Sequence, residues 1–341
     1  MICYFVSEPH QHTVRNYLAD RGQSLAAHFT IIAYERVFAH RNLPAAGTYI
    51  FSDIERLTPA RLDVARQLYR LIRQQYPSAR ILNHPDKSAC RYTLLTELHD
   101  KQQNRFRVRR ANMDCSDLRF PVFIRLENDH KGSRTRLLHD GRELRQAIAA
   151  LRRRSLPARQ LLVTEFCDTA DAAGLYRKYA AFVVAGRIIP RHLIFGHEWM
   201  LKNPAFSDDE RAREQLAFIR SNPHEETLQG ICADARIDYG RIDYSLLDDR
   251  IQVWEINTNP VIMQHSQTYS ARNLAAHNLF SESIRAAFEA LPGMAPESVP
   301  CPLDFSQQLR RRVFFERCCE YAGNRWMRLM YRLLGRSALE M

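Results

Sequence analysis

The chain has 341 residues, 45% hydrophobic and 26% charged, with a formal net charge of +11 at pH 7. This composition is typical of a globular protein with two or three compact lobes. Apolar runs stay short of the roughly 18 residues that a membrane-spanning helix needs, so we expect none. The positive charge favours anionic partners such as nucleotides, phosphorylated substrates, nucleic acid or an anionic membrane surface.

The cysteines and the N-terminus indicate a cytoplasmic protein. The N-terminal MICYFVSEPH lacks the basic start and long apolar stretch of a secretory signal. The eight cysteines form no Cys-x-x-Cys pair and no zinc-site spacing, so we expect reduced thiols. The basic residues carry no aromatic-interleaved motif, and we expect no specific nucleic-acid partner.

Residues 1–84 are predicted to form a parallel α/β domain, because strand and helix patterns alternate along them. The expected strands are 2–6, 30–34, 48–52 and 79–83, and the expected helices are 13–21 and 59–76. Asp86 is a candidate cap for a helix that runs to Leu98.

Two further lobes and a tail are expected after residue 84. The smaller lobe, 85–164, has predicted strands at 120–126, 134–138 and 160–166 and a helix at 142–153. The larger lobe, 165–291, has predicted strands at 178–184 and 187–195, helices at 208–221, 224–235 and 270–290, and a hairpin at 241–260. A proline-containing linker, 292–303, leads to a basic amphipathic helix in 304–341.

The hairpin RIDYSLLDDRIQVWEINTNP, from Arg241 to Pro260, suggests a metal site. Alternation places Glu255 and Asn257 on one face of a strand. A three-residue loop, Asp248 to Arg250, would place Leu247 opposite Ile251 and Asp243 opposite Glu255. Two carboxylates and an amide oxygen are hard donors that suit Mg²⁺, with substrate phosphates completing its shell. The alternative is a set of solvated acids on an exposed strand.

Taken together, the chain resembles the ATP-grasp superfamily, closest to the branch of the ribosomal-protein glutamate ligases and glutathione-synthetase-like enzymes. The resemblance spans roughly 80–290, after a region that looks like the family's pre-ATP-grasp domain. The family's metal strands carry an acid and then Glu-x-Asn followed by Pro, which Asp243, Glu255, Asn257 and Pro260 match. The resemblance implies that the first three hold Mg²⁺, or alternatively Mn²⁺, on the phosphates of ATP.

The resemblance also implies nucleotide-binding residues in the smaller lobe. FPVFIRLENDHKGSRT occupies the place of the phosphate-binding strand and mobile loop, with Arg125 where Lys is usual. Arginine is a competent phosphate donor. Lys131 and Gly132 lie where the glycine-rich loop bends over the phosphates, although this loop has one glycine. VTEFC resembles the adenine hinge, which implicates Glu165, Phe166 and Cys167.

Further candidates follow in the larger lobe. Arg191 lies where many relatives place an arginine that faces the γ-phosphate and the developing acyl phosphate. Lys202 and Asn203 resemble a basic–x–Asn element of the glutamate-ligase branch, without the glycines that follow there. Arg191 and Lys202 are therefore candidate catalytic residues and Asn203 a candidate nucleotide contact. Lys178 is expected to have a surface role.

The resemblance implies an ATP- and magnesium-dependent carboxylate–amine ligase that forms an amide or peptide bond through an acyl phosphate. Two other functions stay open: an ATP-grasp kinase that phosphorylates a hydroxyl of an anionic small molecule, and a non-catalytic nucleotide-binding scaffold. The tail helix is expected to pack on its own domain, with an anionic membrane surface or a partner groove as the alternative. The identity of the substrates and the oligomeric state, including a homodimer, are left undetermined.

Overall fold

The computed structural model describes residues 1–130, 132–154, 156–202, 208–264, 270–293 and 301–334, the last of these without side chains beyond Tyr321. Lys131 and Asn203 therefore lie outside the described residues. The structure is a mixed α/β fold, as predicted, with its strands in four sheets. Among the described helices, none is long and apolar enough to cross a membrane. All eight cysteines are free thiols, as expected.

The N-terminal domain is a parallel sheet in the order β2-β1-β4-β5. Its strands are β1 (Ile2–Val6), β2 (Phe29–Ala33), β4 (Thr48–Phe51) and β5 (Arg80–Leu82), and its helices are α1 (His12–Ala19) and α2 (Pro59–Gln75). Every residue of β1 is buried, and Phe5 stacks on Phe51 with ring centroids 4.9 Å apart. The predicted parallel layer is confirmed, and Pro59 begins α2, where a missing N–H leaves no helical hydrogen bond unmade.

The smaller lobe is an antiparallel sheet in the order β6-β8-β7. It consists of β6 (Val108–Arg110), β7 (Val122–Leu126) and β8 (Leu161–Glu165), with α3 (Arg91–Asp100) and α4 (Gly141–Arg153). The prediction that Asp86 caps a helix is wrong. Residues 85–88 form a turn, Cys90 precedes α3, and Asp86 instead pairs with Arg66.

The predicted strand at 134–138 is also wrong. Only isolated bridges form there, joining Arg125 to Ser133 and Val122 to Leu138. Hydroxyl groups replace a regular ladder: Ser133 Oγ donates to the Ile124 carbonyl (3.2 Å), and the Ile124 amide donates to Thr135 Oγ1 (3.0 Å). Such side-chain bonds offer the backbone an alternative to strand pairing.

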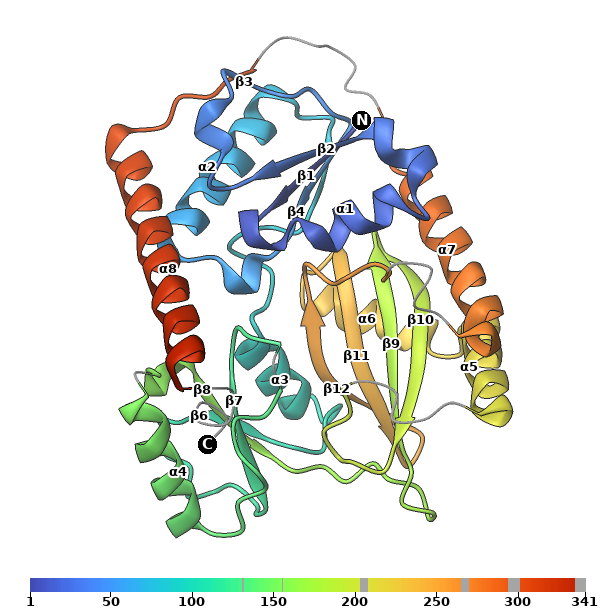
Figure 1. Ribbon diagram of the computed structural model, residues 1–341. Helices are drawn as coiled ribbons and strands as arrows, with labels where there is room; N and C mark the ends of the chain where they lie inside the picture. The colour runs from blue at the N-terminus through green and yellow to red at the C-terminus, as the bar shows by residue number, and fades with distance from the viewer. Residues whose placement is uncertain (131, 155, 203–207, 265–269, 294–300, 335–341) are drawn as a thin grey trace.

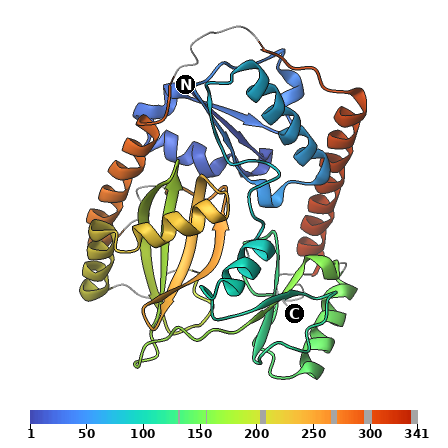
Figure 2. The ribbon, with the colours of Figure 1, turned by 180° about the vertical axis from the view of Figure 1, so that it is seen from behind.

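The larger lobe is an antiparallel sheet in the order β10-β9-β11-β12. Its strands are β9 (Tyr176–Val184), β10 (Arg187–Gly196), β11 (Tyr239–Leu247) and β12 (Arg250–Asn257). The predicted turn between β9 and β10 is confirmed, with positive φ at Ala185 (54°) and Gly186 (87°). The helices α5 (Asp209–Ser221), α6 (Glu225–Asp234) and α7 (Leu274–Glu289) pack against this lobe. Figure 2 shows α6 across the sheet face that is hidden in Figure 1.

The C-terminal segment returns to the N-terminal domain (Figure 1). The short strand β13 (Cys301–Pro302) pairs with β3 (Asn42–Leu43), and α8 (Gln307–Leu334) follows. Leu309 and Val313 are buried in the core that includes α2, and Arg61 of α2 forms an ion pair with Glu320. The first half of the tail helix thus packs on the protein itself, as we expected.

Candidate active site

The hairpin of β11 and β12 brings the predicted acids together by a route that differs from the prediction. The loop has two residues, Asp248 and Asp249, both with positive φ (49° and 58°), and Leu247 pairs with Arg250. The three-residue loop is therefore wrong. A bulge at Trp254 adds the residue that the loop lacks, because the register shifts between Asp243 and Tyr244. Asp243 consequently lies opposite Glu255, as predicted.

Glu255 is buried among cationic side chains from the neighbouring lobe. Arg91 at the start of α3 and Arg125 of β7 each donate a guanidinium N–H to Glu255 Oε2. His130 Nδ1 lies 3.8 Å from Oε1. Burial by itself raises the pKa of this carboxyl, but Arg91, Arg125 and His130 outweigh burial and hold the pKa well below its usual range. Glu255 is therefore ionised.

Asp243 has its own pair of cations. Arg241, two residues earlier on the same face of β11, donates through Nε (2.7 Å) and Nη2 (3.1 Å). Lys178 of β9 places its Nζ 2.8 Å from Oδ2, so the expectation of a surface role for Lys178 is wrong. Burial and nearby Glu255 raise the pKa of Asp243, but Arg241 and Lys178 lower it to about 2. The like charges coexist because each carboxylate carries its own counter-charge.

Asn257 completes the donor set that the sequence suggests. Its Nδ2 lies 3.4 Å from Glu255 Oε1, and its Oδ1 is buried without a hydrogen-bond partner. No group of three or more His, Cys, Asp or Glu side chains in the described parts of the chain has metal-site geometry. The set here is two ionised carboxylates and an amide oxygen left without a donor, which fits a hard cation that completes its shell with water and phosphate.

A cleft between β7 of the smaller lobe and β9, β11 and β12 of the larger lobe leads away from Glu255. It encloses a volume of about 100 Å³. Of its lining residues, Arg125 and Lys178 gather at the pair of Asp243 and Glu255, which forms the cationic end, and Lys202 and several aromatic rings line the rest. Phe123 and Phe166 contact Trp199 at centroid distances of 4.9 and 5.8 Å. One cleft thus combines a cationic end with an aromatic wall.

Most of the predicted nucleotide residues reach this cleft. Its lining includes these six predicted site residues: Arg125, Gly132, Phe166, Cys167, Lys202 and Glu255. Gly132 has φ +84°, and a Cβ there would collide with the side chain of Lys202. The positive φ favours glycine at this position, whereas the flexible end of the Lys202 side chain could move aside.

Four predicted residues lie outside the lining of the cleft: Asp243 and Asn257, which adjoin Glu255, and Glu165 and Arg191. Glu165, 1% exposed, accepts from the backbone N–H groups of Arg107 (3.0 Å) and Arg119 (2.7 Å) and from their guanidinium groups. It thus anchors the segment that carries Phe166. Arg191 is buried in the larger lobe, where Nε donates to the Ile262 carbonyl (3.0 Å) and Nη1 lies 3.2 Å from His277 Nδ1.

Sequence reasoning missed several residues of the site. The spacing of Arg241 and Asp243 placed both on one strand face and could have indicated the ion pair. Trp199 also lines the cleft, and no motif of the sequence indicates it. Arg91 follows Cys90 at a helix start with no motif around it, and only the fold brings it to Glu255.

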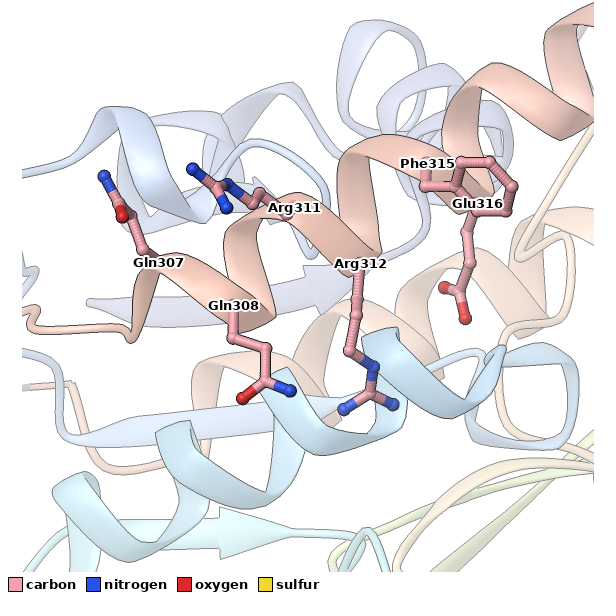
Figure 3. A pocket seen from close by; sticks show the side chains of 6 residues that line it. All are labelled: Gln307, Gln308, Arg311, Arg312, Phe315 and Glu316. Carbon is pink, nitrogen blue, oxygen red and sulfur yellow. The ribbon is translucent and has the colours of Figure 1, made fainter.

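A different hollow, of about 680 Å³, lies on α8. Figure 3 shows its six lining side chains, all from the first turns of that helix. Glu316 among them accepts from the Thr58 hydroxyl and from the Ala60 amide at 3.1 Å, which fastens the helix to the N-terminal domain. These contacts are structural, and the cleft at Glu255 is the better candidate.

Comparisons with known proteins find similar solved structures. No family model and no curated protein matches the chain. Solved structures that it is similar to include a D-alanine–D-alanine ligase from Bacillus anthracis (12% identity, 84% of this chain, 98% of that chain, TM-score 0.45). Another is a RimK domain ATP-grasp protein from Sphaerobacter thermophilus (14%, 83%, 98%, TM-score 0.46). A third is the D-cycloserine synthetase DcsG (14%, 83%, 100%, TM-score 0.44). Because these TM-scores are below 0.5, function is inferred below from the side chains of the cleft.

Proposed function

We propose that this protein is an ATP- and magnesium-dependent ligase of the ATP-grasp type that joins a carboxylate to an amine. The observation that carries the proposal is the pairing of Asp243 with Glu255, because Glu255 lines a cleft that also has basic side chains and an aromatic wall. A nucleoside triphosphate has the same polarity, with an anionic end and a flat aromatic end. The basic and aromatic side chains of the cleft therefore match the two chemical parts of ATP.

When ATP binds, the basic side chains of the cationic end can exchange their carboxylate partners for phosphate groups. Arg125 and Arg91 are held by Glu255, and Lys178 is held by Asp243. Triphosphate oxygens can take over these donors, because arginine binds phosphate with the same fork that it uses for carboxylate. The carboxylates released in this way are ionised and available to a cation.

Asp243, Glu255 and Asn257 would hold the magnesium ions. The metal would neutralise phosphate charge and act as a Lewis acid and template for the transferred group. The low pKa values of both carboxyl groups mean that no proton has to leave before they bind a cation. The orphaned Asn257 Oδ1 would gain the partner that it otherwise lacks.

The reaction proceeds in two steps. An oxygen of the substrate carboxylate attacks the γ-phosphorus, the bond from phosphorus to the bridging oxygen breaks, and ADP leaves with that electron pair. A neutral amine then attacks the acyl carbon, phosphate leaves, and the nitrogen loses a proton to yield the amide. Arg125 and Lys202 of the cleft would stabilise the charge that develops on the transferred group. Arg191 would serve the acyl phosphate only if it left its contacts with Ile262 and His277.

A hydroxylamine trap tests the proposal. ADP release is screened with ATP and Mg²⁺, and in parallel with Mn²⁺, against amino acids, short peptides and phosphosugars. We expect carboxylate-dependent ADP release and, with hydroxylamine added, the hydroxamate of the same carboxylate. If ADP is released, a hydroxyl group of the substrate is phosphorylated and no hydroxamate forms, the protein is a kinase and not a ligase. ATP binding without ADP release across the panel would contradict catalysis.

A further inference from the structure

A second cavity, of about 240 Å³, lies next to the cleft and plays no part in the binding of ATP described above. One residue of its lining, Glu55, belongs to the N-terminal domain, and Arg91 comes from α3. The remaining wall comes from the smaller lobe and the segment before α3: Cys90, Arg110, Glu127, Asn128, Arg159 and Gln160. The cavity thus lies where the first domain meets the smaller lobe.

Arg91 forms the wall between this cavity and the cleft. Its Nη1 donates to the carbonyl oxygens of Leu126 (2.8 Å), Glu127 (2.7 Å) and Asp129 (2.9 Å), and its Nη2 donates to Glu255. The side chain is 6% exposed and lines the cavity. A molecule in the cavity is therefore one side chain away from the end of the cleft assigned to the phosphates.

The acids of the cavity already have partners within the protein. Arg110 Nη2 donates to both carboxylate oxygens of Glu127 (2.9 and 3.0 Å). Glu55 accepts from the Thr258 hydroxyl and lies 3.4 Å from His130. Burial raises the pKa of Glu55, but His130 and Arg56 lower it to about 2. Glu55 is therefore ionised, and both carboxyl groups already have partners outside the cavity or on its wall.

Arg159 provides the uncompensated charge. It belongs to a short 3₁₀ helix, Ala158–Gln160, just before β8, and it is exposed. Among the described residues, no carboxylate forms an ion pair with it. The amide side chains of Asn128 and Gln160 line the same cavity. An anion entering here meets a guanidinium group and amide donors, which together recognise a carboxylate well.

We propose that this cavity binds the second carboxylate of a small dicarboxylate whose first carboxylate is activated in the cleft. The proposal rests on the proposed ligase function and names its substrate class. The cavity volume of about 240 Å³ leaves room for a carboxylate and part of a carbon chain. One carboxylate passes Arg91 toward the transferred phosphoryl group, and the other pairs with Arg159.

Calorimetry on the full chain tests binding at the cavity without catalysis. Succinate, glutarate and L-glutamate are titrated in the presence of ADP and Mg²⁺, with acetate and butyrate as monocarboxylate controls. We expect at least one dicarboxylate to bind more tightly than both monocarboxylates, and its affinity to fall about 10-fold in Arg159→Ala. The matched control is Arg153→Ala, an exposed arginine at the end of α4 outside the cavity, which should bind as the wild type does.

Hydroxamate kinetics provide the second readout. Arg159→Ala should raise KM for the dicarboxylate about 10-fold and leave KM for ATP unchanged, since Arg159 lies outside the cleft. Equal affinity of wild type and Arg159→Ala, or no binding of any of the three dicarboxylates, overturns the cavity assignment. If no carboxylate yields a hydroxamate but a dicarboxylate still binds in a way that depends on Arg159, the ligase function is wrong and the binding site stands.

Discussion

The two ends of the cleft are organised by different forces. At the cationic end, α3, β7, β9 and β11 each send a charged group to one of two buried carboxylates on the β11–β12 hairpin. At the aromatic wall, Trp199 is positioned by ring contacts with Phe123 and Phe166. Ion pairs therefore position the side chains of the cationic end, whereas packing between rings positions those of the aromatic wall.

This difference predicts unequal responses to substitution. Removing one member of a buried ion pair leaves its partner charged and unpaired in a poorly solvated site, which is costly. Removing one ring loses contact area, and the neighbouring rings still exclude water.

Glu255→Gln should have the largest effect. The variant keeps the size of the side chain, loses a ligand charge for magnesium and leaves Arg91 and Arg125 without their carboxylate. We expect magnesium-dependent ADP release to fall by at least about 100-fold and the free energy of unfolding to fall by about 3–5 kcal/mol. Glu289→Gln, at the exposed end of α7, is the matched control and should change stability by less than about 0.5 kcal/mol. Wild-type ADP release by Glu255→Gln would refute the metal assignment.

The contribution of Asp243 to the free energy of unfolding should depend on pH in the acid range. Its folded pKa of about 2 lies below its ordinary value of 3.8, so its stabilisation is complete above pH 4 and is lost as pH falls toward 2. We expect the stability difference between wild type and Asp243→Asn to shrink by about 2 kcal/mol over that range. Urea unfolding at a series of pH values measures it. If this stability difference does not change with pH, Lys178 and Arg241 do not lower the pKa of Asp243.

Trp199→Ala should affect nucleotide affinity with little change in kcat. Loss of a ring that contacts a base costs about 1–3 kcal/mol, so KM for ATP should rise about 10-fold or more. Tyr321→Ala removes an aromatic ring that is 70% exposed on α8 and should leave KM unchanged. If Trp199→Ala instead lowers kcat alone, the aromatic wall does not hold the base.

Asp249→Gly should have the smallest effect, because it lies at the opposite end of the same hairpin from the acids. Asp249 has φ +58° in a two-residue loop that favours glycine at this position. We expect a gain of about 0.5–1 kcal/mol in the free energy of unfolding and unchanged ADP release. Reduced ADP release would show that the loop end of the hairpin is coupled to the acid pair.

The N-terminal sheet and the faces of the hairpin could be predicted because they depend on local periodicity. Alternation alone put Glu255 and Asn257 on one strand face, and alternating strands and helices predicted a parallel layer. The prediction that Asp243 lies opposite Glu255 is correct, but it assumed a three-residue loop that the structure does not have. The short loop and the bulge at Trp254 compensate for one another, and neither has a clear pattern in the sequence.

The sequence by itself determined which chemical groups are present and which face of each strand they occupy, because these follow from neighbouring residues. Only the tertiary structure decided which cations meet which acids. Arg91 and Glu255 are 164 residues apart, and no local pattern records their contact. Such pairs form because buried charges need partners, and the fold selects which partner lies within reach.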